Sequence, residues 1–451
     1  MSDLLPETRR ALRHRLAVGQ TQGRTPSVVA AVMRDGRTVW AEGWGTVDGR
    51  TPDGDTQYRI GSITKTLTAI LVLRLRDEGR LRLDDALDAH LPGTAAGGAT
   101  IGALLAHTAG LAAEPPGPWW ERTPGELRPE LADVLPPTPY VFPPGLRFHY
   151  SNPGYALLGA LIERVRGASW SDVLHREVLE PLGMRRTGSQ PVAPHASGWA
   201  VHPWADVLLP EPARDLGRMA PAGQLWSTAA DLATLGAFLL DGDDRVLSRD
   251  SIEEMRASHT PEYGYGTQLL RQPDGRVLPG HTGSLPGFVS TLLVDAEERV
   301  GAVVLGNTTA GLPVDVITAD LIRIVAEREP RIPDPWRPLP SADPDLLALA
   351  GPWYWGPNPY LLRPLADGFL ELSSLRGGGS RGTRLRPDPD GAWTGISGYF
   401  EGERLRVERD AGGAVTHLDV GTFVFTRLPY APAGPVPGGV DPDGWRGLDA
   451  R

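Results

Sequence analysis

The chain has 451 residues, no cysteine and a formal net charge of −10. This length predicts two or three domains, and 41% hydrophobic with 22% charged residues is ordinary for a soluble globular protein. The acidic balance argues against nucleic acid as a partner, and the absence of cysteine excludes disulfides, thiolate metal sites and a cysteine nucleophile.

No apolar run precedes the first polar residues, so the sequence predicts no secretory signal. No stretch approaches the roughly 18 apolar residues of a membrane span. We therefore expect a cytoplasmic protein without membrane contact. Nothing in the sequence requires a cofactor or a metal ion, and small molecules or peptides are the expected partners.

Within the first 330 or so residues, strand patterns occur near both ends of the region and helical patterns lie between them. This order predicts one sheet that is assembled from the two ends of the region. Residues 80–270 give mainly helical signals and form the expected helical lobe, so the active site should lie where sheet and lobe meet. The other expected elements are a helix at 3–20, a hairpin of strands 28–33 and 38–42, a helix at 66–79, a hairpin of strands 288–294 and 300–305, and a helix at 314–327.

Residues 112–145 form a long stretch rich in proline and glycine that contains Trp119 and Trp120. Long irregular segments in compact domains are often active-site lids or pocket walls. A packed surface loop is the equal alternative at this stage.

A second domain is predicted after a Pro-rich linker at residues 330–345. Short strand-like runs separated by Gly-bearing turns follow, and their spacing predicts a small antiparallel β-barrel at residues 346–430. These runs are 360–362, 369–372, 404–407 and 422–425. The expected division is therefore a domain at 1–329, the linker, the barrel, and a Pro/Gly-rich tail at 431–451.

Lys65 is the only lysine of the chain, which otherwise uses arginine for its positive charges. A guanidinium stays protonated, whereas a buried ammonium can lose its proton and serve as a base. Ser62 precedes Lys65 by three residues, so the two sit one turn apart at the positive end of the predicted helix. This spacing favours a Ser62 nucleophile activated by Lys65, although a Ser-x-x-Lys pattern alone also arises by chance.

A serine–lysine pair needs groups that pass a proton to the leaving group and donors that stabilise an oxyanion. Two later stretches contain such groups. They are Tyr150-Ser151-Asn152, just before an apolar helical run, and His281-Thr282-Gly283-Ser284, at a strand edge flanked by glycines.

Ser62-x-x-Lys65, Tyr150-x-Asn152 and His281-Thr282-Gly283, in this order, resemble the three motifs of the class C β-lactamase and penicillin-binding-protein superfamily. Residues 104–111, 181–184 and 222–228 resemble further stretches of that family, and the resemblance covers about residues 20–328. It implies an α+β fold in which an antiparallel sheet packs with a helical lobe.

The resemblance implies a role for each motif residue. Ser62 would be the acylated nucleophile, Lys65 would take its proton, and Tyr150 would shuttle a proton to the leaving group or from the acceptor. Asn152 would hold the substrate amide and orient Lys65. The backbone N–H groups of Ser62 and Ser284, the latter following Thr282 and Gly283, would form the oxyanion hole. Lysine and tyrosine both have ordinary pKa values of about 10, so base catalysis at neutral pH requires that at least one is lowered.

One position departs from the family pattern, because the third motif usually opens with lysine and here opens with His281. An imidazole can be neutral or charged near pH 7, so His281 could pair with Tyr150 as a second base instead of holding a substrate carboxylate. His107, within the supporting stretch 104–111, is expected to be structural.

The barrel and its Gly351-Pro352-Trp353-Tyr354-Trp355-Gly356 motif resemble the lipocalin-like domain of the standalone penicillin-binding-protein-type thioesterases, which cyclise nonribosomal peptides. This resemblance implies that a peptidyl thioester, borne on a carrier protein, acylates Ser62 through a D-residue before the peptide's own amine attacks. Arg446, with Arg427 second, is the candidate for binding a terminal carboxylate, and an exposed surface arginine is the alternative for each.

Two other functions remain open from the sequence. One is a cytoplasmic esterase or a D-stereospecific amidase, aminopeptidase or carboxypeptidase, which would release free acid instead of a cyclic product. The other is a non-catalytic binding protein that has kept the fold. The retained Lys65 and the complete Tyr150-x-Asn152 argue against this last function.

Overall fold

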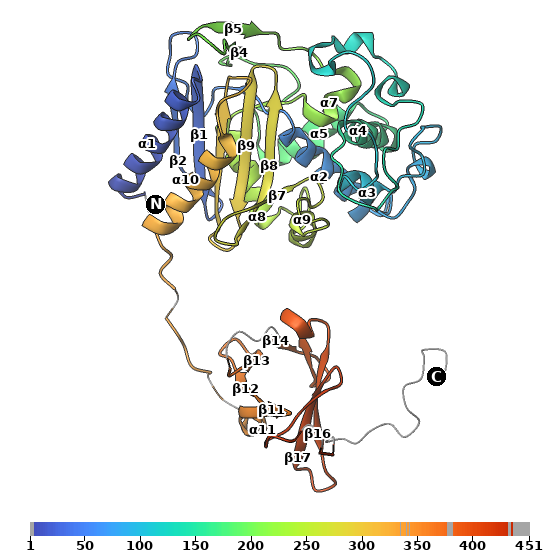
Figure 1. The fold of residues 1–451 in the computed structure, drawn as a ribbon, viewed down its shortest axis with the longest axis vertical. Helices are drawn as coiled ribbons and strands as arrows, with labels where there is room; N and C mark the ends of the chain where they lie inside the picture. Colours follow the sequence, from blue (N-terminus) through green and yellow to red (C-terminus); the bar gives the residue numbers. More distant parts are fainter. Residues whose placement is uncertain are drawn as a thin grey trace. The chain divides into compact units, whose positions relative to one another are not determined.

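The computed structural model describes residues 4–333, 335–339, 341, 343–376, 382–431 and 434–435 (Figure 1). The chain divides into two compact units, Met1–Arg331 and Ile332–Arg451. Among the described residues, none of the helices combines the length and the apolar character that crossing a membrane requires.

The first unit is built on a six-stranded antiparallel sheet with the strand order β2-β1-β10-β9-β8-β7. Strands from both ends of the unit meet at its centre, where Val28 of β1 pairs with Gly306 of β10. The predicted sheet built from both termini is thereby confirmed. The strands are β1 (Ser27–Arg34), β2 (Arg37–Gly45), β7 (Gln268–Arg271), β8 (Val277–Leu285), β9 (Phe288–Asp295) and β10 (Val300–Gly306).

Alternate residues of β1 enter two different cores, as the two-residue period of a strand requires. Val28, Ala30 and Val32 pack in the core beneath α1 (Pro6–Gln22) and α10 (Val314–Arg328), which lie together on one face of the sheet in Figure 1. Val29, Ala31 and Met33 belong to the larger core shared with the helical lobe. Both faces of β1 are therefore buried.

The helical lobe follows the prediction for residues 80–270 in part. Its helices are α2 (Ile63–Asp77), α3 (Ile101–Leu105), α4 (Asn152–Arg166), α5 (Trp170–Leu174), α6 (Glu180–Leu182), α7 (Ala220–Gly223), α8 (Ala229–Asp241) and α9 (Arg249–Arg256). Two small strand pairs were not predicted: β3 (Tyr58–Arg59) with β6 (Trp226–Ser227), and β4 (Gly198–Val201) with β5 (Leu208–Glu211). These strands have two to four residues each, which is too short for a recognisable alternation.

The second unit is a small antiparallel barrel, as predicted. Its eight strands pair in sequence order, and two backbone hydrogen bonds between Tyr354 and Thr426, of 2.7 and 2.9 Å, join its first and last strands. Trp353 lies fully buried in its core. The elements are α11 (Pro344–Leu349), β11 (Gly351–Trp355), β12 (Asn358–Pro364), β13 (Leu370–Ser374), β14 (Thr383–Pro387), β15 (Trp393–Gly395), β16 (Arg404–Arg409), β17 (Val415–Val420) and β18 (Phe423–Phe425).

Candidate active site

Ser62 lies at the N-terminus of α2, directly after the β3 strand and a glycine in a left-handed conformation. Gly61 has φ +49, and a Cβ on it would lie 2.7 Å from the backbone nitrogen of Ser284. Such contact leaves no room for a side chain, so a glycine at position 61 is required on two grounds. The close approach brings the start of α2 against β8.

Lys65 is fully buried one turn along α2, beside the Ser62 hydroxyl. Its Nζ lies 3.0 Å from Ser62 Oγ and 2.7 Å from the backbone carbonyl oxygen of Ala222 in α7. Burial lowers the pKa of Lys65 from 10.5 to about 7, against the opposing attraction of Glu114 and Glu121. A large share of the Lys65 amine is therefore neutral at pH 7 and available as a base.

Tyr150 borders the same pair of side chains. The Lys65 Nζ lies 4.9 Å from the centroid of the Tyr150 ring. Burial raises the pKa of Tyr150 well above its ordinary value, and the neighbouring Ser62 side chain opposes the rise only in part. Tyr150 therefore keeps its proton at neutral pH, in contrast to Lys65.

Asn152 begins α4 and is held by a residue that the sequence did not single out. The Asn152 Nδ2 donates to Glu114 Oε1 at 2.9 Å and to Glu114 Oε2 at 3.1 Å. Trp120 Nε1 donates to the same carboxylate at 2.7 Å. We expected Asn152 to orient Lys65, but the hydrogen bonds of Lys65 go to Ser62 and Ala222.

His281 lies in β8 and uses both ring nitrogens in hydrogen bonds to other groups. Nδ1 is 2.6 Å from the carbonyl oxygen of Thr282, which can only accept, so Nδ1 carries the proton. Nε2 then accepts from the hydroxyl of Tyr263 at 2.8 Å. Burial lowers the pKa of His281 to about 3, and the charge of Lys65 adds to this effect. His281 is thus a neutral imidazole.

The expected pairing of His281 with Tyr150 is not formed in this structure. The two ring centroids are 6.3 Å apart, and the Tyr263 hydroxyl occupies the His281 nitrogen that such pairing needs. A direct catalytic role of His281 therefore stays a prediction, while its hydrogen bonds indicate that it fixes the start of the third motif.

The third motif presents its backbone toward α2. Thr282 donates through its N–H and its hydroxyl to Gln268 Oε1, both at 2.9 Å, so its N–H points away from the paired strand β9. Ser284 lies two residues further along the same strand and its N–H therefore has the same direction. At Gly283, a Cβ would collide with the carbonyl oxygen of Ile60. Position 61, the residue before Ser62, therefore lies against the backbone nitrogen of Ser284. An oxyanion hole formed by the N–H groups of Ser62 and Ser284 stays a prediction.

Residues 8–327 match the beta-lactamase family model. This chain belongs to the beta-lactamase family. A second model, a domain of unknown function (DUF7586), matches residues 342–427 and assigns no activity to the barrel. The lipocalin likeness of the barrel therefore stays a prediction.

Relatives of this beta-lactamase family member include penicillin-binding proteins. The chain is 30% identical to Penicillin-binding protein 4 of Amycolatopsis lactamdurans over 332 residues, which cover 66% of this chain and 84% of that protein. Penicillin-binding protein 4* of Bacillus subtilis is 26% identical over 55% of this chain and 60% of its own length.

Two groups of solved structures resemble this family member. SurE, whose solved structures include one with D-Leu, is 26% identical and has a TM-score of 0.57, and the match covers 94% of this chain and at least 99% of SurE. A D-stereospecific amidohydrolase from a Streptomyces species is 25% identical with a TM-score of 0.56, over 71% of this chain and 98% of that protein. The SurE match includes the barrel unit, whereas the amidohydrolase match is shorter.

Residues 112–145 supply site residues that the family motifs do not include. Besides Glu114 and buried Trp120, this segment contains Glu121, whose carboxylate accepts from Trp119 Nε1 at 2.8 Å. Burial raises the pKa of Glu121, and the neighbouring Glu114 charge contributes. The sequence left open whether residues 112–145 are a pocket wall or a packed surface loop. These contacts favour a wall of the active site. The tryptophan pair was the signal in the sequence.

His107 contacts two residues of the second motif, Ser151 and Tyr150. Its Nδ1 accepts from the backbone N–H of Ser151 at 3.0 Å, and its buried ring lies 4.2 Å from that of Tyr150, centroid to centroid. These contacts agree with the structural role expected for His107. By holding the backbone of Ser151, His107 also fixes the positions of its two chain neighbours, Tyr150 and Asn152.

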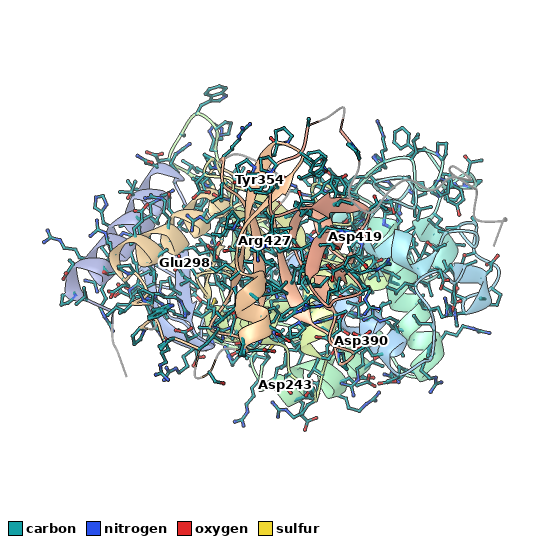
Figure 2. All side chains as sticks on the ribbon, turned by 90° about the horizontal axis from the view of Figure 1, so that it is seen from below. Asp243, Glu298, Tyr354, Asp390, Asp419 and Arg427 are labelled. Carbon is teal, nitrogen blue, oxygen red and sulfur yellow. The ribbon has the colours of Figure 1, made fainter. Side chains whose placement is uncertain are left out.

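The two candidate arginines belong to the second unit. Arg427, which is labelled in Figure 2, donates to the carbonyl oxygens of Ala350 and Pro352, at 3.1 and 3.2 Å. Its guanidinium lies over the ring of Trp353. Arg446 lies outside the described residues. Substrate binding by either arginine stays a prediction. Across the described ranges, no group of three or more His, Asp or Glu side chains is placed to hold a metal ion.

Proposed function

We propose that this chain is a serine acyltransferase or hydrolase that forms an acyl-enzyme on Ser62. The observation that carries this proposal is the buried Lys65 amine, 3.0 Å from Ser62 Oγ, with a pKa of about 7. An amine with such a pKa is close to the ideal for general-base catalysis at neutral pH.

The contacts favour Lys65 over the other two candidates as the base. Tyr150 keeps its proton because burial raises its pKa, so it suits a donor or a relay. The imidazole of His281 is neutral, but its free lone pair is used by the hydroxyl of Tyr263. Lys65 is the group that is both partly neutral and in hydrogen-bond contact with the nucleophile.

The reaction would run in two steps. In the first, Ser62 Oγ bonds to the acyl carbon while its proton passes to Lys65, and Tyr150 transfers a proton to the leaving thiol or amine as its bond breaks. In the second, water or an amine attacks the acyl carbon, loses a proton to the Lys65–Tyr150 pair, and Ser62 Oγ leaves with that proton. Both tetrahedral states place negative charge near the N–H groups of Ser62 and Ser284.

For the substrate we propose an acyl group that ends in a D-residue, in its finer form a nonribosomal peptidyl thioester delivered by a carrier protein and cyclised head to tail. SurE supports this form because it was solved with D-Leu and its likeness extends over 94% of this chain, including the barrel unit. The carrier protein and the cyclisation come from the resemblance of the motifs and the barrel.

Hydrolysis of D-amino-acid amides is the second candidate. It is favoured by the likeness of the catalytic unit to a D-stereospecific amidohydrolase. Both candidates use the same acyl-enzyme and the same configuration at the acyl residue, and they differ in the group that attacks it.

Product analysis tests the proposal. The wild type and Ser62→Ala are incubated with a linear peptidyl thioester that ends in a D-residue, and the products are weighed by mass spectrometry. A product one water lighter than the free acid, absent with Ser62→Ala, is expected for cyclisation. Free acid, or turnover of D-amides alone, would replace cyclisation by the second candidate.

Labelling tests the acyl-enzyme independently of the substrate. A fluorophosphonate should form an adduct on Ser62 of the wild type, located by peptide mass spectrometry. No adduct would indicate a non-catalytic binding protein and would overturn the proposed chemistry.

A further inference from the structure

Gln268 begins strand β7 at a point where the neighbouring strand β8 continues beyond it. The two strands pair only as far as Gly280, which is the partner of Gln268. On this side, the part of β8 that follows Gly280 meets no further strand in the described chain. This open edge leads to Ser284, whose backbone nitrogen lies against the residue before Ser62. Gln268 therefore stands at the start of an edge that runs toward the nucleophile.

The Gln268 side chain is hydrogen-bonded to the third motif. Its Oε1 accepts from the backbone N–H and from the hydroxyl of Thr282, both at 2.9 Å. The backbone N–H can only donate, so the oxygen of the carboxamide, and not its nitrogen, faces Thr282. The hydroxyl must then donate to the same oxygen. One backbone group thus fixes the orientation of both the Gln268 carboxamide and the Thr282 hydroxyl.

These hydrogen bonds leave one donor and one acceptor free side by side. The Gln268 Nε2 has no partner among the described residues and is not enclosed, and Thr282 Oγ1 keeps its lone pairs on a partly buried residue. Nε2 and Oε1 belong to one carboxamide, so Nε2 lies within about 5 Å of Thr282 Oγ1. The C=O and N–H of a single substrate amide can therefore bind to Nε2 and Oγ1 together.

A carboxylate in the same place would find only one of these two partners. It can accept from Gln268 Nε2, but it has no proton to give to Thr282 Oγ1. The ring of His281 offers no further donor, because Nδ1 donates to the carbonyl oxygen of Thr282 and Nε2 accepts from Tyr263. A site built around a hydrogen bond discriminates strongly against an analogue that cannot form it, since the site's own polar group is left unpaired.

We propose that Gln268 and Thr282 bind a neutral amide group of the substrate, and that Gln268 is the specificity-determining residue that excludes a carboxylate from this position. This inference rests on the proposed acyl-enzyme on Ser62. The amide has two possible sources. It belongs to the leaving group in the first step, or to the attacking amine in the second.

Two experimental arms separate these sources. In the first, N-acetyl-D-phenylalanine is supplied as its thioester with thioglycolamide or with thioglycolate, so that the leaving thiol carries a carboxamide or a carboxylate. In the second, the acyl-enzyme is offered glycinamide or glycine as the attacking amine. The amide preference is the ratio of the two kcat/KM values, or of the two aminolysis rates. Differences in intrinsic reactivity cancel when this ratio is compared between wild type and variant.

Two substitutions should move the amide preference in opposite directions. Gln268→Leu removes the donor for the amide and frees the Thr282 hydroxyl to donate to a carboxylate, so the preference should fall by about tenfold or more. Gln268→Glu keeps an acceptor for Thr282 but places an oxygen at the position of Nε2. A carboxylate then finds no donor, and the preference should rise by about threefold or more. General damage to the third motif would lower both rates alike.

Gln272→Leu is the matched control. Gln272 directly follows β7, and its Nε2 donates to the carbonyl oxygen of Leu270 at 3.3 Å, away from the third motif. Its replacement should leave the amide preference unchanged.

The outcomes separate the two proposals. An unchanged preference in both Gln268 variants, a shift of both in the same direction, or an equal shift in Gln272→Leu would overturn the role of Gln268. Should Gln268→Leu fail to fold, the direction of the change in Gln268→Glu decides. A shift confined to one arm supports the proposal and identifies the source of the amide. Fluorophosphonate labelling of Ser62 is measured in parallel, and an unlabelled wild type would instead refute the acyl-enzyme itself.

Discussion

The amine of Lys65 lies 3.0 Å from the hydroxyl of Ser62, at the end of a side chain that is fully buried. Burial disfavours the charged ammonium, so the amine loses its proton near pH 7 and can then act as a base. An arginine would remain charged in the same place. The single lysine of the chain therefore lies at the position where a basic side chain must be able to lose its proton.

The acylation rate should depend on pH through this group. Lys65 has a pKa of about 7 and acts as a base when neutral, so acylation of Ser62 should rise with pH and level off above that value. In Lys65→Arg the acylation rate should fall by about 10²–10⁴-fold, since general-base catalysis contributes that much. The rise of the rate near pH 7, called the pH limb below, should vanish. Burst kinetics with a chromogenic ester between about pH 5 and 9 measure both.

The variant His281→Ala is the control for that experiment. In this variant the rise of the acylation rate near pH 7 should persist, because the lowered pKa of His281 places its own titration far below that range. Loss of the limb in His281→Ala, with a normal limb in Lys65→Arg, would assign the base to His281.

Lys65 should also make the fold less stable at neutral pH. Its pKa is 10.5 when solvated and about 7 in the fold, so between these values the unfolded chain binds more protons. Stability therefore rises with pH across that window, and below about pH 7 the full penalty is present. Lys65→Met should be more stable than the wild type at about pH 6, by about 2 kcal/mol after the lost hydrogen bonds are subtracted.

Urea unfolding at several pH values measures this difference. The advantage of Lys65→Met should shrink as the pH approaches the solvated value of the lysine. A Met variant that is less stable than the wild type throughout would show that the Lys65 hydrogen bonds outweigh its desolvation.

Gly61 offers a test of the contact between α2 and β8. Gly61→Ala would place a Cβ 2.7 Å from the Ser284 nitrogen, pushing apart the N–H groups of Ser62 and Ser284. Loss of one oxyanion donor costs about 10²–10³-fold in rate, and a reduction of that size in acylation is expected. Gly79→Ala is the matched control, because Gly79 has φ +67 but nothing within 4 Å of its Cβ position.

Both variants carry the strain of a left-handed alanine, about 1–2 kcal/mol, so thermal unfolding should detect a loss in each. Activity should fall in Gly61→Ala alone. Equal acylation rates in the two variants would mean that the approach of Ser284 to α2 has no part in the reaction.

The sequence predicted those features that local patterns encode. The strands around residues 28–33 and 288–305 follow from their short apolar runs on either side of a turn, and Ser62, Lys65 and Tyr150 follow from motif spacing. Glu114 was missed because its partner Asn152 lies 38 residues away, across an irregular segment. The possible His281–Tyr150 pairing is not formed in this structure because Tyr263, 18 residues before His281, takes the free ring nitrogen. Contacts of this kind depend on tertiary packing, which no local periodicity records.

The barrel should lose stability when its central tryptophan is removed. Trp353 is fully buried, and its Nε1 donates to the carbonyl oxygen of Leu349 at 2.8 Å. Trp353→Ala should cost about 3–5 kcal/mol, as expected for a large aromatic side chain in a core. Trp336, 82% exposed in the linker, is the matched control, and its replacement by alanine should change stability by less than about 0.5 kcal/mol. Calorimetry measures both, and the larger loss should fall on the barrel transition, since the barrel has a core of its own. Equal losses in the two variants would contradict the packing described for Trp353.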